Sequence, residues 1–315
     1  MLTFDRVRNK PTVLQQLTGL NPEVFGDLLP AFLEALAYHN QLADAQRPTP
    51  RKRQPGGGRK PLLRDPADRL LFILFYFRIY PVQRVQAFFF GMSQTQACDW
   101  VHRITPVVNR ALGAEQHLPE RRPARLVSIL RQCPGLEFII DGTERPNQRP
   151  KDKDRQQQYY SGKKKRHTVK NVVVVEKRTR RIRMLSRTTE GKRSDKRIAE
   201  DEDYRFPKDS RLWYDLGFQG YRPRGAIPIH PIKKPRNGEL TPGQKHHNRA
   251  IAHGRVRVEH AIGGVKVFHI TPSTSGTGRG CKALLIVTLH QFAQIEGPHV
   301  CPVLFNVGYT LFLCT

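Results

Sequence analysis

The stretch VKNVVVVEK, residues 169–177, constrains the fold more than any other part of the sequence. Its consecutive valines put β-branched side chains on both faces of a strand, and such a strand lies inside a sheet covered on both sides. LEFIID (136–141), RIRMLSRT (181–188) and RLWYD (211–215) are predicted as further strands. SDKRIAEDEDY (194–204) and residues 239–268 are predicted as helices. The sequence therefore predicts a mixed α/β sheet from about residue 136 onward.

The preceding part of the chain has apolar residues at helical spacing. Residues 12–42 predict two short helices broken at Gly19 and Pro22. Residues 66–105 are typical of a helix-turn-helix, with helices at about 66–79 and 82–89 and a turn at Gly91. A third helix follows SQTQ (93–96), a capping box in which Ser93 and Gln96 bond each other's backbone. Its expected inward residues are Ala97, Trp100, Val101 and Ile104.

The outward face of this third helix carries Gln94, Gln96, Asp99 and Arg103. Amides and a guanidinium at the start of a recognition helix suit base edges in the major groove of DNA. Gln94, Gln96 and Arg103 are therefore candidate DNA contacts. A plain three-helix bundle with a solvated face is the alternative.

The charge of the chain indicates a polyanionic partner. Lys and Arg number 54 against 27 Asp and Glu, which gives a net charge of +27. Such a surface attracts phosphate backbones, although an anionic membrane surface would attract it too. The apolar run at residues 70–80 is too short to span a bilayer and contains Arg78. The N-terminal residues do not resemble a signal peptide, so we expect no membrane segment and a cytoplasmic, nucleoid-associated protein.

Two basic segments are candidate DNA-binding elements. Residues 47–62 are rich in Pro, Gly and basic residues, which is typical of a linker or of an arm along the DNA backbone. Their glycines are not followed by the Lys-Ser/Thr of a P-loop. Residues 149–187 contain 15 Lys or Arg against three acids, with tyrosines beside a basic run. This composition is typical of nucleic-acid binding, with a solvated loop as the alternative. The candidate contacts there are Lys163, Lys164, Lys165, Arg166 and Lys170.

Isolated acids in so basic a chain need a reason. Asp141 and Asp215 are expected at the ends of neighbouring strands, where two carboxylates repel each other unless a cation lies between them. Mg²⁺ prefers such oxygen ligands. Glu259 follows on a predicted helix, on one face with Arg255 and Lys266, which are candidate phosphate contacts. Two ions about 4 Å apart would suit phosphodiester displacement, although a single acid is more often a cap or an ion-pair partner.

Other chemistries fit the sequence less well. The five cysteines are odd in number and form no C-x-x-C pair, which argues against a disulfide framework or a zinc ribbon. Histidines 246, 247, 253 and 260 surround Glu259, but no H-E-x-x-H spacing exists for zinc. A basic RNA-binding protein would need an RNA module, and no RRM or KH signature is present.

Five ordered motifs together resemble one family: IIDGTERPNQRP (139–150), YYSGKKKRHTVKN (159–171), DLGFQGY (215–221), IKKPRNGELT (232–241) and RVRVEHAIGGVK (255–266). Over about residues 12–268 the chain is similar to bacterial transposases of the insertion-sequence five family, which is related to the eukaryotic Harbinger type. The resemblance implies an RNase H-like catalytic domain whose Asp-Asp-Glu triad is Asp141, Asp215 and Glu259.

The same resemblance implies an activity. The triad would hold Mg²⁺ or Mn²⁺, with two ions expected, for cutting element ends and joining the 3′-hydroxyl to target DNA. The helix-turn-helix would bind terminal inverted repeats, and two paired ends would require a homo-oligomer. Asp195 is a rival for the second triad position, in a stretch where Ser194 replaces the family's His. We interpret it as an N-terminal helix residue beside the ligands rather than as one of them.

The expected division of the chain is an N-terminal helical segment (1–46), a basic linker (47–62), the helix-turn-helix domain (63–125), the catalytic domain (134–295) and an atypical tail (296–315). Residues 269–315 depart from the family pattern. A decayed copy that binds DNA without catalysis is therefore the alternative to an active transposase.

Overall fold

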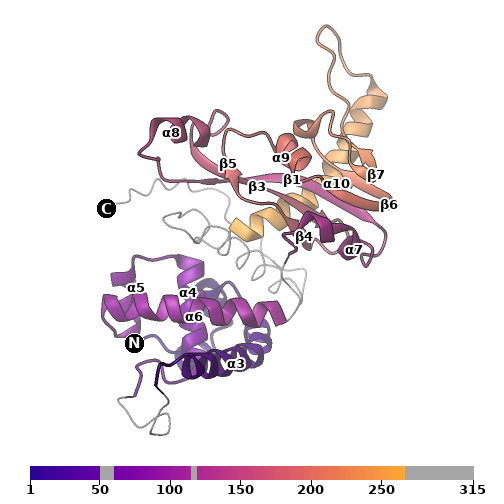
Figure 1. Ribbon diagram of the computed structural model, residues 1–315. Coiled ribbons are helices and arrows are strands. Elements are labelled where there is room, and N and C mark those ends of the chain that lie inside the picture. Colours follow the sequence, from indigo (N-terminus) through magenta and orange to yellow (C-terminus); the bar gives the residue numbers. More distant parts are fainter. Residues whose placement is uncertain (50–59, 115–118, 267–315) are drawn as a thin grey trace.

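The structure is a computed structural model that describes residues 1–49, 60–114 and 119–266. The helices of the N-terminal part pack together, and the sheet with its covering helices forms a second body above them in Figure 1. Most of the linker expected at 47–62 and all of residues 267–315, including the atypical tail, lie outside the described residues.

Six helices make up the described N-terminal part: α1 (Phe4–Val7), α2 (Pro11–Thr18), α3 (Pro22–Ala45), α4 (Pro66–Ile79), α5 (Gln83–Phe90) and α6 (Gln94–Ala114). Helix α2 ends at Gly19, whose φ of 80° is the left-handed conformation that glycine adopts without strain. The break at Gly19 is thus confirmed. Helix α3, however, is one helix of 24 residues rather than a short one, and it continues through Pro30. Its buried Leu28, Phe32 and Leu36, one turn apart, hold it against the core.

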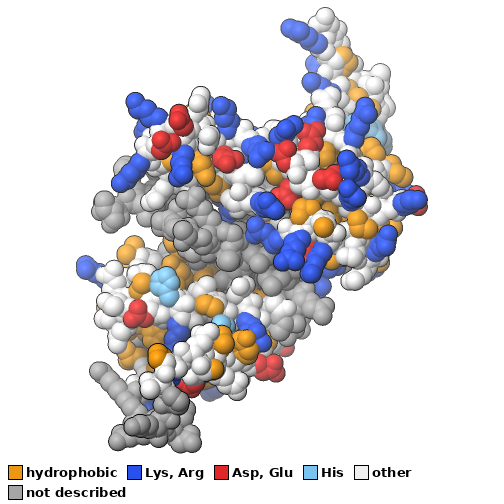
Figure 2. All heavy atoms as spheres, viewed as in Figure 1, with side chains coloured by type: hydrophobic (Ala, Val, Ile, Leu, Met, Phe, Trp, Pro, Cys, Tyr) orange, Lys and Arg blue, Asp and Glu red, His pale blue; other side chains and the backbone are white. Residues whose placement is uncertain are grey.

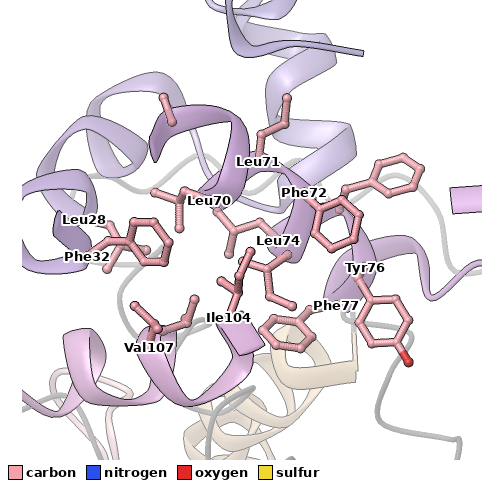
Figure 3. Packing of buried hydrophobic residues seen from close by; sticks show 14 of the residues in the cluster. Leu28, Phe32, Leu70, Leu71, Phe72, Leu74, Tyr76, Phe77, Ile104 and Val107 are labelled. Atoms are coloured by element: carbon pink, nitrogen blue, oxygen red, sulfur yellow. The ribbon is translucent and has the colours of Figure 1, made fainter. Parts of the chain in front are cut away.

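Helix α4 is the centre of this core. All eight side chains from residue 70 to 77 are buried, which suits a helix that is apolar all round and enclosed by others. Figure 3 shows its leucines and phenylalanines packed between Phe32 of α3 and Ile104 and Val107 of α6. The predicted helix-turn-helix is confirmed in its helices, and the capping box forms: Gln96 N donates to Ser93 Oγ (3.2 Å) and Ser93 N donates to Gln96 Oε1 (3.0 Å).

The second body is a mixed sheet with the strand order β2-β3-β1-β6-β7, in which β4 and β5 also pair with β3. Strand β1 runs antiparallel to β3 and parallel to β6, and β6 runs parallel to β7. The strands are β1 (Glu137–Pro146), β2 (Tyr160–Ser161), β3 (Arg166–Glu176), β4 (Ile182–Leu185), β5 (Thr189–Glu190), β6 (Arg205–Trp213) and β7 (Arg224–Ile229). The helices are η1 (Pro123–Arg125), α7 (Leu126–Leu130), α8 (Lys153–Tyr159), α9 (Asp195–Asp201), η2 (Leu216–Phe218) and α10 (Pro242–Lys266).

The two faces of the sheet carry separate cores. Phe138 and Ile140 of β1 pack with residues of α7 and α9, whereas Ile139 packs with Val258 and Ile262 of α10. Alternation along β1 therefore separates an α9 face from an α10 face. The valines of β3 divide between the two cores in the same way, which confirms the prediction of a strand buried on both sides.

Two strand predictions were wrong in their bounds, and both concern the acids. Strand β1 continues through Asp141 to Pro146, because its second half pairs with the first half of β3, and Asp141 lies opposite Val173. Asp141 is therefore in mid-strand rather than at a strand end. Strand β6 begins at Arg205 and ends at Trp213, so Asp215 follows the strand instead of ending it.

Candidate active site

Asp141 and Asp215 lie on the same face of the sheet. In the parallel pair β1–β6, Ile139 lies opposite Trp213, and each aspartate follows two residues later on its own chain segment. Because Ile139 and Trp213 both pack in the α10 core, both aspartates fall on the α10 face. Asp215 is also the N-cap of η2, and its Oδ1 accepts a hydrogen bond of 2.8 Å from Gly217 N.

Arg255 of α10 joins the two carboxylates. Its Nη2 lies 3.5 Å from Asp141 Oδ2 and 3.8 Å from Asp215 Oδ2, with only 15% of its side chain exposed. Gly254 brings α10 this close to the sheet, because a Cβ there would come within 3.0 Å of the Trp213 ring. The buried Nε of Arg255 has no hydrogen-bond partner within the described part of the chain. The guanidinium of Arg255 thus has two carboxylate partners, while its Nε–H makes no hydrogen bond to them.

The environment of Asp141 raises the pKa of its carboxyl to about 6. Burial is the main cause, and the nearby charges of Asp215 and Asp195 add to it. Arg255 and the Gly142 N–H, which donates to Asp141 Oδ1 at 2.8 Å, act in the opposite direction. A buried acid beside like charges at a raised pKa is typical of a functional site.

Asp195 supports this site from the other face of the sheet. It begins α9 after the N-cap Ser194, as predicted, and its carboxyl lies directly over Gly142, where a Cβ would come within 2.3 Å of its Cγ. Gly142 alternates with Asp141, so Asp195 lies on the α9 face. Burial raises the pKa of Asp195, and Lys170, whose Nζ lies 3.5 Å from Asp195 Oδ1, opposes the rise.

Glu259, the third predicted acid, is not part of this arrangement. It is exposed, one turn beyond Arg255 on α10, and it forms no ion pair or hydrogen bond with any described residue. Across residues 1–49, 60–114 and 119–266, no three His, Cys, Asp or Glu side chains come together as a metal site would need. The structure brings together two of the three predicted carboxylates.

The donor chemistry nevertheless fits a divalent cation. Asp141 and Asp215 offer hard oxygen ligands on the α10 face of the sheet, with 18% and 40% of their side chains exposed, and Mg²⁺ commonly takes one or two protein carboxylates together with water and phosphate oxygens. The positive charge of Arg255 lies where the two acids need a cation. Asp141 and Asp215 are therefore the residues that could hold a metal ion here.

The candidate DNA contacts divide into exposed and paired side chains. Gln94, Gln96 and Arg103 are exposed on α6; Gln96 Oε1 is used by the capping box, and Arg103 lies over the ring of Trp100, 5.4 Å from its centroid. Lys163, Lys164 and Lys165 are exposed between β2 and β3, and Arg166 is the exposed first residue of β3. Lys170, by contrast, is mostly buried in its ion pair with Asp195, and Arg255 faces acids rather than solvent. The side chain of Lys266 lies outside what the structure describes.

The sequence interpretation assigned no role to Gly142, and it placed Lys170 among the DNA contacts rather than in an ion pair with Asp195. The one available signal was the glycine directly after Asp141, because glycine in a strand interior marks the close approach of another group.

Two family models match the chain. Residues 62–114 match the helix-turn-helix of DDE superfamily endonuclease, and residues 140–291 match the DDE superfamily endonuclease. The first match covers α4, α5 and α6, and the second begins one residue before Asp141.

Two curated relatives are similar to the chain. A protein assigned as the transposase of insertion sequence element IS702 from Microchaete diplosiphon is 28% identical over 73% of this chain and 80% of its own length. A protein assigned to insertion sequence element IS112 of Streptomyces albus G is 25% identical over 90% of this chain and 96% of its own. No solved structure matches.

No described helix is long and apolar enough to cross a membrane.

These matches agree with the observed fold, a helical N-terminal part followed by a mixed α/β sheet consistent with an RNase H-like domain. The chain carries a helix-turn-helix domain and an endonuclease domain of the DDE superfamily.

Proposed function

We propose that this protein is the DNA transposase of an insertion sequence of the insertion-sequence five family, acting on DNA in the cytoplasm at the nucleoid. The meeting of Asp141 and Asp215 on one face of the sheet is the observation that carries the proposal. Two carboxylates this close repel each other, and a metal ion bound between them would remove that repulsion. The basic surface of the protein would hold the DNA phosphate at the same place. The endonuclease match over residues 140–291 supports the same assignment.

Asp141 and Asp215 would hold Mg²⁺ or Mn²⁺, with two ions expected, and Glu259 would supply the third carboxylate. Glu259 lies on the same side of α10 as Arg255, about 6 Å farther along the helix axis. When bound, such ions activate an attacking oxygen and stabilise the leaving oxygen in phosphodiester displacement.

Arg255 has two roles in this proposal. Without metal, its guanidinium lies between the two aspartates and offsets the repulsion of their like charges. With DNA bound, the N–H groups that the aspartates release donate to a phosphate near the reacting bond, because guanidinium matches phosphate geometry. Asp195 and Lys170 position the Asp141–Gly142 stretch from the opposite face.

Binding of the DNA ends is assigned to two surfaces. Gln94, Gln96 and Arg103 of α6 would read the terminal inverted repeats, and residues 163–166 would hold the phosphate backbone near the acids. Burial raises the pKa of Asp195, and Lys163 supports the second assignment because it lies close enough for its charge to oppose this rise. Pairing of two ends would require at least two copies of the chain.

Cleavage of labelled duplexes that carry the element's own terminal repeats tests the proposal. We expect Mg²⁺-dependent nicking at the 3′ end by the unchanged protein and none by Asp141→Asn. The matched control is Asp209→Asn, an exposed acid with no partner among the described residues, which should leave nicking unchanged. Repeat binding without nicking by any of the three proteins would instead identify a decayed copy that only binds DNA.

A further inference from the structure

Between β7 and the sheet-packed part of α10, the chain forms a projecting arm, residues 232–250. It comprises a loop and the first nine residues of α10, and Figure 1 shows it standing away from the sheet. No side chain of the arm is buried, and Ile251 is the first residue of α10 that is. A helix end that buries nothing gains little from tertiary packing, so its stability must come from elsewhere.

Local hydrogen bonds hold the arm in shape. Asn248 accepts from Ile232 N at 2.8 Å and donates to Ile232 O at 2.9 Å, which ties the loop to the helix. Thr241 and Gln244 form a capping box: Gln244 N donates to Thr241 Oγ1 (3.3 Å), and Thr241 N donates to Gln244 Oε1 (3.0 Å). These hydrogen bonds therefore give the arm a defined structure.

The arm presents unpaired positive charge. Its five Lys and Arg face a single acid, Glu239, which pairs with Lys245 at 3.3 Å. The other four cations, Lys233, Lys234, Arg236 and Arg249, form no ion pair or hydrogen bond with any described residue. Figure 2 shows Lys and Arg side chains along this projection, at the upper right of the molecule. Exposed cations fixed on a rigid element suit a phosphate backbone.

The position of the arm indicates which phosphates of the DNA it would contact. The same helix carries Arg255, which touches Asp141 and Asp215. Arg249 precedes Arg255 by six residues and Lys245 by ten, which is about 9 and 15 Å along the helix axis. Since base pairs stack about 3.4 Å apart, this distance corresponds to about three to five base pairs.

We propose that the arm grips the backbone of the duplex whose phosphate lies at Asp141 and Asp215, about three to five base pairs from the reacting bond. The inference rests on the proposed function, and it adds a DNA contact that neither the helix-turn-helix nor residues 163–166 provide. The contact is to phosphates, so it holds DNA of any sequence.

The test compares two triple variants of the full chain. The arm variant is Lys233→Gln, Lys234→Gln and Arg249→Gln, and the control is Arg178→Gln, Lys208→Gln and Arg222→Gln. Lys233 and Lys234 follow Ile232, which is bonded to Asn248 beside Arg249. All six side chains are exposed and unpaired among the described residues, so both variants lose the same charge without disturbing the core. Binding to a labelled repeat duplex is measured over a range of salt, and hydroxyl-radical footprints locate the protected phosphates.

We expect the arm variant to bind about tenfold more weakly near 0.1 M salt, with a salt slope smaller by about 2 to 3. It should lose protection at phosphates about three to five base pairs from the reacting bond, while the control keeps it. Equal losses in both variants, or an unchanged footprint, would overturn the inference and leave the proposed function standing. A loss of binding to anionic lipid vesicles but not to duplex would overturn it as well, and failure of the unchanged protein to bind duplex would overturn both proposals.

Discussion

Replacement of Gly142 by alanine should destabilise the sheet domain by about 2–4 kcal/mol. The new Cβ would lie 2.3 Å from Asp195 Cγ and 2.5 and 2.6 Å from its two carboxylate oxygens, so Asp195 must move. Overpacking of this kind costs about 1–3 kcal/mol. The move also breaks the 3.5 Å ion pair with Lys170, whose side chain is only 13% exposed, at a further cost of about 1 kcal/mol after allowance for the partial exposure of Asp195.

A double-mutant cycle identifies the source of the loss. Asp195→Ala removes the atoms that the new Cβ meets, so adding Gly142→Ala to it should cost under about 1 kcal/mol, which gives a coupling of about 1–4 kcal/mol. Urea unfolding of the metal-free protein is followed by Trp213 fluorescence in a Trp100→Phe background, because these are the two tryptophans of the chain and only Trp213 lies in the sheet.

Gly162→Ala is the matched control, since a Cβ there meets nothing within 4 Å. It should change stability by no more than about 0.5 kcal/mol. If Gly142→Ala behaves like this control, or if Asp195→Ala does not relieve its cost, then Asp195 is not held against Gly142 and the reasoning fails.

Three further outcomes are expected. Because the folded-state pKa of Asp141 is raised to about 6 from 3.8, the folded protein holds this proton more tightly, and the unfolding free energy should fall as pH rises from about 4 to 6, by about 3 kcal/mol at most. Urea melts at pH 4.5 and 7.5 check this, and Asp141→Asn should flatten the dependence. Saturating Mg²⁺, at about 100 times its Kd, should stabilise the unchanged protein by about 2.7 kcal/mol and Asp141→Asn by much less, as calorimetric melting would show. Ser93→Ala should cost about 1 kcal/mol in the helical core by losing the cap of α6, measured by Trp100 fluorescence in a Trp213→Phe background.

Elements with strong local signals were predicted closely. Helix α4 has the predicted bounds, since its N-cap Asp65 and the apolar run after it are read directly from the sequence. The third helix begins where the capping box places it. Strand β3 was identified by its valines, which are buried on both faces as expected.

Features that depend on pairing between segments distant in the sequence were not predicted. Strand β1 continues past Asp141 because β3 supplies partners for its polar second half, and nothing in residues 142–146 alone indicates a strand. The two aspartates were predicted to meet, but the cation that meets them in this structure is Arg255. Helical periodicity put Arg255 and Glu259 on the same side of α10 and could not decide which of them faces the acids.

Helix α10 runs without a break from Pro242 to Lys266, so the helical part of the arm and Arg255 belong to one rigid helix about 37 Å long. Substitutions on its exposed side leave their separation unchanged. A single residue inserted between Arg249 and Arg255 would instead turn the arm by about 100° relative to the two aspartates. In evolution, the length of this segment should therefore vary less than its composition.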